Sequence, residues 1–166
     1  MTRRRDILTT SAFGLVAAAV GGSFLDLIKP AKATPKGTFP FNLTKEEWHK
    51  RLEPAAFDVL REEGTERAFT SPLNDEHRNG TFACKGCAQK LFASDTKFDS
   101  GTGWPSFFQP LSGAVGESAD HTYGVTRTEV HCANCGGHLG HVFDDGPKPT
   151  GLRYCMNGVA MTFAPA

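Results

Sequence analysis

Two Cys-x-x-Cys pairs constrain the fold of this chain more than any other feature. The first pair is Cys84 and Cys87, and the second is Cys132 and Cys135. A Cys-x-x-Cys turn lets two thiolates reach one ion, and two such turns supply the four soft ligands that tetrahedral zinc takes at about 2.3 Å. The pairs therefore predict a structural zinc that joins two segments lying far apart in the sequence.

Other uses of a Cys-x-x-Cys pair fit this sequence less well. Haem attachment needs a histidine directly after the second cysteine, whereas Ala88 and Gly136 occupy those positions. A thioredoxin-like redox pair needs a βαβ setting, which neither pair has. A disulfide across two residues is strained and easily reduced, so closed structural zinc is the favoured interpretation.

The first 33 residues predict export from the cytoplasm. Arg3, Arg4 and Arg5 precede Asp-Ile-Leu and a mildly apolar run over residues 11–25, and residues 31–33 read Ala-Lys-Ala. A charged segment, a short apolar segment and an Ala-x-Ala site form a secretory signal, and the Arg-Arg-x-Ile-Leu order resembles a twin-arginine signal. We expect passage through the twin-arginine export machinery, cleavage after Ala33 and a periplasmic location. A membrane anchor is the alternative, but the run is shorter than the about 20 apolar residues of a span.

The rest of the chain has the size of one domain. A linker rich in Pro, Lys and Gly covers residues 34–42, and the domain covers residues 43–166. Without the leader, 13 Lys and Arg face 16 Asp and Glu, a net charge of −3. Because no basic face is implied, we expect no nucleic-acid partner. We also expect a monomer.

Short helices followed by short strands are predicted along the domain. Thr44 and Glu47 form a capping box before a helix over residues 44–52, and Pro54 opens a second helix that stops before Gly64. Asn79-Gly80 is a hairpin signal, loops are expected over residues 99–105, 111–117 and 144–151, and strands over residues 90–93, 121–130, 141–143 and 152–163. The predicted fold class is mainly β, a small antiparallel barrel or two-sheet fold with short N-terminal helices and a zinc joining the two Cys-x-x-Cys turns.

The fifth cysteine, Cys155, lies in the predicted C-terminal strand. Side chains alternate along a strand, so Arg153, Cys155 and Asn157 share one face. A positive charge beside a thiol favours the thiolate, which is the nucleophilic form. A lone cysteine is also commonly a small, inert core residue, so the pattern by itself leaves both roles open.

Four motifs, taken together in this order, resemble the B-type methionine sulfoxide reductases. They are the first Cys pair, Gly101-Thr102-Gly103-Trp104-Pro105-Ser106-Phe107, Cys132-x-x-Cys135-Gly-Gly-His138-Leu-Gly-His141-Val-Phe143, and Arg153-Tyr154-Cys155-Met156-Asn157. The similarity runs over residues 43–163. It implies an enzyme, a peptide-methionine (R)-S-oxide reductase, in which the four paired cysteines bind zinc, Cys155 attacks the sulfur and Trp104 packs on the substrate methyl group.

The residue types suit this chemistry independently of the resemblance. Reduction of a sulfoxide needs a thiolate for the electrophilic sulfur and a proton source for the oxygen. Cys155 supplies the first, and His138 or His141 the second, with His141 favoured. Arg153 and Asn157 would orient the oxygen or stabilise the thiolate. The products are methionine and a Cys155 sulfenic acid, so the implied role is repair of oxidised proteins and peptides in the cell envelope.

One position departs from the family pattern. Many members carry a resolving cysteine in the loop before the tryptophan, where this chain has Thr102. If zinc takes four of the five thiols, none remains to resolve the sulfenic acid. We therefore expect a one-cysteine cycle in which an external thiol donor, such as a thioredoxin-like protein, attacks Cys155 directly.

A function from another class stays open at this point. The same zinc-stapled β-architecture could be a binding module, in which Trp104 and phenylalanines form an aromatic recess that holds a ligand without converting it. Cys155 discriminates between the two, because a binding module has no need of an activated thiol.

Overall fold

The computed structural model describes residues 37–166. The predicted signal peptide at residues 1–33 and the first three residues of the predicted linker lie outside the described residues. Within residues 37–166, every helix is too short or too polar to cross a membrane.

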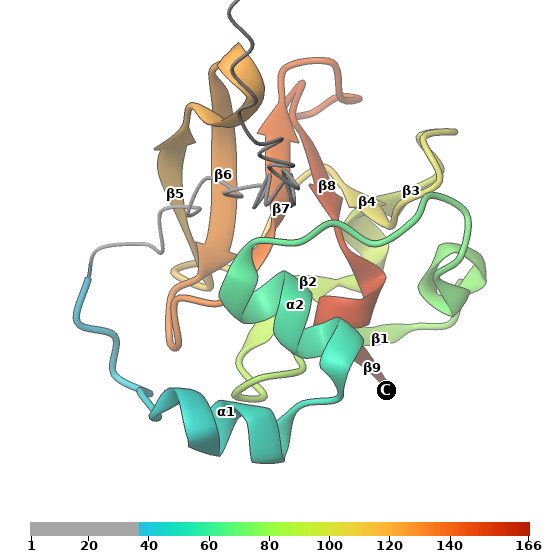
Figure 1. Cartoon of the computed structure of the whole chain (residues 1–166). Helices are drawn as coiled ribbons and strands as arrows, with labels where there is room; N and C mark the ends of the chain where they lie inside the picture. Colours follow the sequence, from blue (N-terminus) through green and yellow to red (C-terminus); the bar gives the residue numbers. More distant parts are fainter. Residues whose placement is uncertain (1–36) are drawn as a thin grey trace, which may run out of the picture. The chain divides into compact units, whose positions relative to one another are not determined.

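Two short helices form where the sequence predicts them. The helix α1, Lys45–Arg51, begins with the expected capping box, since Thr44 Oγ1 accepts from the Glu47 backbone N–H and the Glu47 carboxylate accepts from the Thr44 N–H. The helix α2, Pro54–Glu62, begins at its proline and ends at a residue in the left-handed conformation. Figure 1 shows the two helices together at one end of the domain, with α2 nearer the strands.

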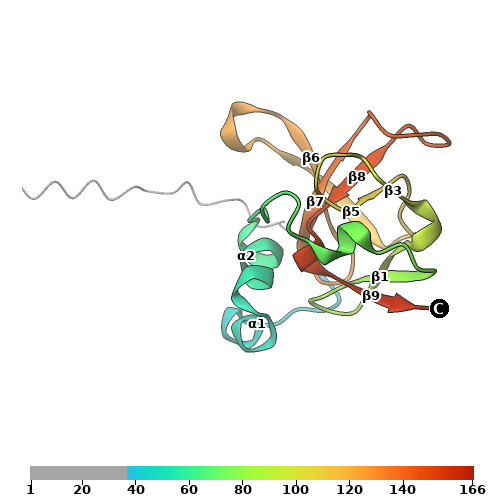
Figure 2. The same ribbon diagram turned by 90° about the vertical axis from the view of Figure 1, so that its right-hand side faces the viewer.

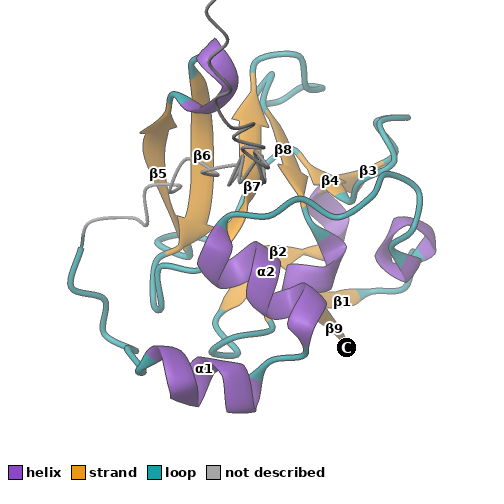
Figure 3. Ribbon diagram, in the orientation of Figure 1, coloured by secondary structure: helices purple, strands orange, loops and turns teal. Residues whose placement is uncertain are grey.

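Two antiparallel sheets make up most of the domain, which confirms the predicted fold class (Figure 3). The smaller sheet has the order β2-β1-β9, with β1 Gly80–Cys84, β2 Lys90–Ala93 and β9 Met161–Pro165. The larger sheet has the order β3-β4-β8-β7-β6-β5, with β3 Lys97–Phe98, β4 Ser106–Phe107, β5 Val115–Asp120, β6 Arg127–Cys132, β7 His138–Phe143 and β8 Arg153–Met156. Short 3₁₀ turns complete the chain at η1 Pro72–Asp75, η2 Ser94–Thr96, η3 Thr122–Gly124 and η4 Gly158–Ala160.

Phenylalanine side chains join the two sheets. Phe92 of the smaller sheet stacks on Phe107 of the larger one with ring centroids 4.3 Å apart, and Phe82 meets Phe107 edge-on at 4.9 Å. All three rings are fully buried. Burial of a Phe side chain contributes about 1.5–3 kcal/mol, so this trio is a substantial part of the core. The view in Figure 2 shows β1 and β9 close to the strands of the larger sheet, with the helices on one side.

Three expectations about the strands are wrong. The expected hairpin at Asn79-Gly80 does not form, because η1 precedes it and β1 simply begins at Gly80. The expected strand over residues 121–130 starts only at Arg127, since Asp120 accepts from the backbone N–H of Thr122 and holds residues 122–124 in a 3₁₀ turn. The expected strand over residues 152–163 divides into β8 and β9, because the backbone N–H groups that follow β8 donate to the side chain of Glu66 rather than to a strand.

Each Cys-x-x-Cys turn, called a knuckle below, connects two neighbouring strands. The first connects β1 to β2 in the smaller sheet, and the second connects β6 to β7 in the larger sheet. Their backbones match. The N–H four residues after the first cysteine donates to that cysteine's carbonyl at 2.8 Å in both, from Ala88 to Cys84 and from Gly136 to Cys132. This position has a positive φ in both knuckles, 60° at Ala88 and 66° at Gly136.

The mismatch between Ala88 and its conformation gives a stability prediction. A residue with a Cβ pays roughly 1–2 kcal/mol to adopt the left-handed conformation, and glycine avoids this cost. Glycine also makes the unfolded chain more flexible, which cancels part of the gain in stability. We expect Ala88→Gly to raise the free energy of unfolding by about 0.5–1 kcal/mol, measured by thermal and urea denaturation. Ala133→Gly in the other knuckle is the control and should lower stability, because the φ of Ala133 is not positive. A destabilised Ala88→Gly protein would contradict the strain argument.

Candidate active site and metal centre

The four knuckle sulfurs converge on one point between the two sheets. Cys84 Sγ lies 3.7 Å from Cys135 Sγ, Cys87 Sγ lies 3.6 Å from Cys132 Sγ, and all four lie within 4.8 Å of one another. Four sulfurs at about 2.3 Å from a tetrahedral ion lie about 3.8 Å from one another. The cluster could therefore hold a zinc-sized ion without rearrangement. Its shortest contacts join one knuckle to the other, so such an ion would tie the two sheets together.

The pKa values of the four thiols depend on one another, so the four cysteines do not act as independent ligands. Hydrogen bonds from the other thiols, that of Cys132 first, and burial raise the pKa of Cys84. A hydrogen bond with Cys132 lowers the pKa of Cys87, the most exposed of the four. The pKa of Cys135 is raised as well and that of Cys132 is lowered, so each knuckle pairs one thiol that holds its proton with one that loses it more readily. A bound cation must displace the remaining protons.

A row of side chains crosses the larger sheet at the height of Cys155. Strand pairing places Ser106 of β4 opposite Cys155 of β8, Cys155 opposite His141 of β7, and His141 opposite Glu129 of β6. Directly opposed residues project from the same face with Cβ atoms about 4.5–5.5 Å apart. The sheet register therefore brings a thiol and an imidazole together from segments that are 14 residues apart in the sequence.

A cavity of about 190 Å³ opens onto the half-buried Cys155. Trp104 and Phe143 give it aromatic walls, and His141 and Asn157 give it polar groups. The structure thus brings together four of the residues singled out from the sequence, namely Trp104, His141, Cys155 and Asn157. The cavity has the size and lining for a small group that is apolar on one side and polar on the other.

His141 is held by the carboxylate of Asp120, which also binds the Arg127 guanidinium. Its Nε2 lies 2.9 Å from Asp120 Oδ2, which also accepts from Arg127 Nη2 at 2.6 Å. Burial opposes ionisation of Asp120, but hydrogen bonds from Thr122, His141 and Arg127 outweigh it and lower the pKa of this carboxyl. Burial lowers the pKa of His141, and the hydrogen bond to Asp120 opposes this effect without cancelling it. The net lowering of this pKa makes the His141 cation a stronger acid than free imidazolium.

His138 has a different place. Its side chain is buried, its Nδ1 lies 2.8 Å from Glu129 Oε1, and Ser118 Oγ donates to the other carboxylate oxygen at 2.6 Å. Its ring meets the His141 ring edge-on at a centroid distance of 5.4 Å. His138 does not line the cavity of Cys155, and it reaches the site only through its ring contact with His141.

The side chain of Arg153 pairs with Asp145 and does not line the cavity. Its guanidinium donates to both oxygens of Asp145, at 2.8 and 2.9 Å, and lies 4.4 Å from the centroid of the Phe143 ring. The hydrogen bond to Asp145 raises the pKa of Arg153, and the neighbouring Cys155 side chain, when ionised, raises it further. Arg153 therefore holds an aromatic wall of the cavity and adds a positive potential near Cys155.

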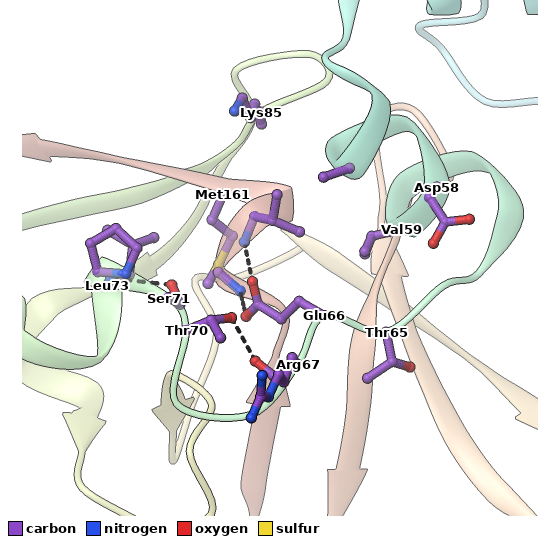
Figure 4. Close-up of a pocket in the computed structure, with 14 residues that line it drawn as sticks. Asp58, Val59, Thr65, Glu66, Arg67, Thr70, Ser71, Leu73, Lys85 and Met161 are labelled. Carbon is purple, nitrogen blue, oxygen red and sulfur yellow. Dashed lines mark hydrogen bonds between the residues drawn. The ribbon is translucent and has the colours of Figure 1, made fainter.

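Glu66 connects three parts of the site, and nothing in the sequence analysis singled it out. Its carboxylate accepts from the backbone N–H groups of Gly158 and Val159 at 2.5 and 2.9 Å (Figure 4). Its carbonyl accepts from Trp104 Nε1 at 3.1 Å, and its N–H donates to Asn157 Oδ1 at 2.9 Å. Burial raises the pKa of Glu66, and the two backbone donors oppose that shift. The segment around Glu66 also lines a larger cavity of about 560 Å³ between α2 and η4, shown in Figure 4.

Asn157 retains one free donor toward the cavity. Its Nδ2 donates to the Leu139 carbonyl at 3.0 Å, and its Oδ1 is taken by the Glu66 N–H. A side-chain amide has two N–H hydrogens, so the second can donate to an acceptor in the cavity. Sequence reasoning missed Glu66 and Asp120, because each acts through a contact between segments that are distant along the chain, and it gave Phe143 no role within its motif.

A two-sheet fold stapled by four cysteines, with a separate cysteine beside a histidine in an aromatic cavity, defines a thiol-based enzyme. Comparisons with known proteins name the family. The profile described as SelR domain matches residues 52–165. A peptide methionine sulfoxide reductase MsrB of Agrobacterium fabrum is 55% identical over 125 residues, which cover 75% of this chain and 93% of the relative. Proteins of the same name from Leptospira interrogans and Thiobacillus denitrificans are 50% and 53% identical, covering 75% and 74% of this chain and 96% and 93% of the relatives.

The chain therefore belongs to the SelR-domain family of peptide methionine sulfoxide reductases, the MsrB enzymes. This confirms the resemblance drawn from the four sequence motifs.

Proposed function

We propose that this protein reduces the R epimer of methionine sulfoxide in oxidised proteins and peptides. The observation that carries the proposal is the pairing of Cys155 with His141 across β7 and β8, at the mouth of a cavity that Trp104 and Phe143 line. The methyl group of the substrate packs on the aromatic walls. The sulfoxide oxygen faces His141 and the free N–H of Asn157, which leaves the sulfur toward Cys155.

In the proposed reaction, the Cys155 thiolate attacks the sulfoxide sulfur while His141 protonates the oxygen. The S–O oxygen passes to Cys155, methionine leaves, and Cys155 becomes a sulfenic acid. The lowered pKa of His141 reduces the fraction of its cation at pH 7, but it makes that cation a better donor to a weakly basic oxygen. Asp120 keeps this cation accessible, since its hydrogen bond acts against the effect of burial.

Regeneration is proposed to need thiols from outside the chain. An external thiol attacks the Cys155 sulfenic acid, its proton leaves with the hydroxyl group as water, and the mixed disulfide is resolved by a second thiol of the donor. Thr102 occupies the loop position beside Cys155, with Oγ1 3.8 Å from the sulfur, where an internal resolving cysteine would lie. The four other cysteines of the chain are gathered in the knuckle cluster. The donor is proposed to be a thioredoxin-like protein.

We propose that the cluster binds a structural zinc through Cys84, Cys87, Cys132 and Cys135. The sulfur separations match a tetrahedral site, and zinc would supply folding free energy rather than chemistry at Cys155.

We also propose a cellular location for the protein. The twin-arginine-type signal at residues 1–33 would direct the folded, metal-loaded domain to the periplasm, with cleavage after Ala33. That route suits a protein whose four metal-binding thiols must meet their ion before they meet an oxidising compartment.

The central test uses Cys155→Ser. With a peptide containing both epimers of methionine sulfoxide and dithiothreitol, the wild-type protein should consume the R epimer and leave the S epimer, as followed by chromatography. The variant should show no reduction above buffer, while its metal content and melting temperature stay close to wild type, because only the nucleophile is lost. Near-wild-type turnover by the variant would contradict the role of Cys155 as nucleophile, and no turnover by the wild type would favour a binding module.

The zinc proposal predicts a stoichiometry and a stability effect. Metal analysis of the purified protein should find one zinc per chain, and Cys87→Ser should lose it and melt at a much lower temperature. Zinc binding contributes on the order of 10 kcal/mol to the folding of small zinc domains. Cys155→Ser is the matched control, because it removes a thiol outside the cluster. A well-folded wild-type protein without zinc would contradict the proposal.

The one-cysteine cycle predicts an end point without reductant. Substrate alone should yield one methionine per chain and a Cys155 sulfenic acid, which dimedone traps and mass spectrometry locates. In Thr102→Cys, the two sulfurs would lie close enough to bond after a small adjustment, so a disulfide between positions 102 and 155 should form instead. A wild-type bridge from Cys155 to a knuckle cysteine would show that the metal site also resolves the sulfenic acid.

A further inference from the structure

Three hydroxyl groups form a hydrogen-bonded chain that ends at the Cys155 sulfur. Ser106 Oγ lies 3.1 Å from the Trp104 carbonyl oxygen and 2.7 Å from Ser100 Oγ. Ser100 Oγ lies 2.8 Å from Thr102 Oγ1, which lies 3.8 Å from Cys155 Sγ. Ser106 is fully buried and stands directly opposite Cys155 in the β4–β8 pair. The proposed reaction makes no use of Ser100 or Ser106.

When all four of these contacts are hydrogen bonds at once, the number of protons allows only one set of directions. A carbonyl oxygen can only accept, so Ser106 donates its single hydroxyl hydrogen to Trp104. Ser106 must then accept from Ser100, which spends the only hydrogen that Ser100 has. Ser100 in turn accepts from the Thr102 hydroxyl, as it does from the Thr102 backbone N–H at 3.4 Å. Thr102 is left with lone pairs toward the sulfur.

We propose that Ser106 and Ser100 are positioning residues that orient the Thr102 hydroxyl as an acceptor for the Cys155 thiol in the resting protein. A hydrogen bond that uses the S–H hydrogen favours the neutral thiol over the thiolate. The thiolate is the form that oxidants attack. The chain therefore restrains the reactivity of Cys155 before a substrate arrives. This inference goes beyond the proposed function, because it concerns the thiol of the unliganded protein.

Three charged or titratable groups also face Cys155 from the elements around it. Arg153 lies on the same face of β8 and interacts with the Cys155 side chain, His141 opposes Cys155 from β7, and Arg127 lines the same cavity. Arg153 favours the thiolate, so it acts against the hydroxyl chain. Among the described residues, no hydrogen bond joins these groups to the three hydroxyls. A change within the chain of hydroxyls thus leaves their contacts in place.

Removing one hydroxyl should reverse the chain. In Ser106→Ala, Ser100 loses its acceptor and turns its hydrogen to Thr102 Oγ1, so Thr102 turns its own hydrogen to the sulfur. Thr102 then stabilises the thiolate. Ser100→Ala has the same consequence, because it leaves the Thr102 hydroxyl without its acceptor. The half-buried Ser100 keeps the test available if the buried Ser106→Ala does not fold.

The test is the pH dependence of alkylation of the zinc-loaded protein by iodoacetamide, with the label located at Cys155 by mass spectrometry. In Ser106→Ala and Ser100→Ala, the pH of half-maximal alkylation rate should fall by about one unit, which corresponds to a tenfold larger acid dissociation constant. Ser94→Ala is the matched control, because Ser94 also holds a hydrogen bond, from Gly80 N–H, outside this chain. Its profile should equal that of wild type.

A second background separates orientation of Thr102 from a general loosening of β4. Thr102→Val keeps the shape of the side chain and removes its hydroxyl, so Ser106→Ala should cause no further shift in that background. An unchanged profile in both serine variants would overturn the proposal. So would a shift that persists in Thr102→Val, since it would come by a route other than the Thr102 hydroxyl. Alkylation needs no sulfoxide, so these outcomes are independent of whether the protein reduces one.

Discussion

The contact between the two knuckles is the constraint on which the rest of the structure depends. One knuckle turns β1 into β2 and the other turns β6 into β7, so the four sulfurs join the two sheets at their turns. A metal at this point would fix the start of β7, which begins at His138, only three residues after Cys135. The position of His141 relative to Cys155 therefore depends on a cluster that takes no part in the chemistry proposed at Cys155.

The second constraint is the register of the larger sheet. Cys155 and His141 face the cavity because they are directly opposed, while their neighbours Tyr154 and Met156 point into the core. A slip of one residue between β7 and β8 would exchange these faces and bury the thiol. The core and the active site are therefore specified by the same strand pairing. Glu66, which lies outside the sheet, also fixes these positions, because it binds the backbone after β8 and the indole of Trp104.

Local sequence signals predicted those elements whose causes are local. The capping box at Thr44, the proline at the start of α2 and the two Cys-x-x-Cys turns all formed as expected, because each depends on residues within a few positions of one another. The edge strand β5, Val115–Asp120, was missed. Its Gly, Ser and Ala residues have little strand preference, and it is held by its hydrogen bonds to β6. The division of the C-terminal strand was missed because its cause, Glu66, lies about 90 residues away.

By itself, the sequence determined the chemical inventory of this protein: four thiols spaced for one tetrahedral ion, a fifth thiol on a strand, and two histidines beside the second knuckle. Spacing along the chain carries that information, because knuckles and strand alternation are short-range geometry. Only the tertiary structure decided that His141 rather than His138 lines the cavity, that Arg153 pairs with Asp145, and that Thr102 lies against the sulfur. These outcomes depend on strand register and on contacts between segments far apart in the chain, and no local pattern encodes either.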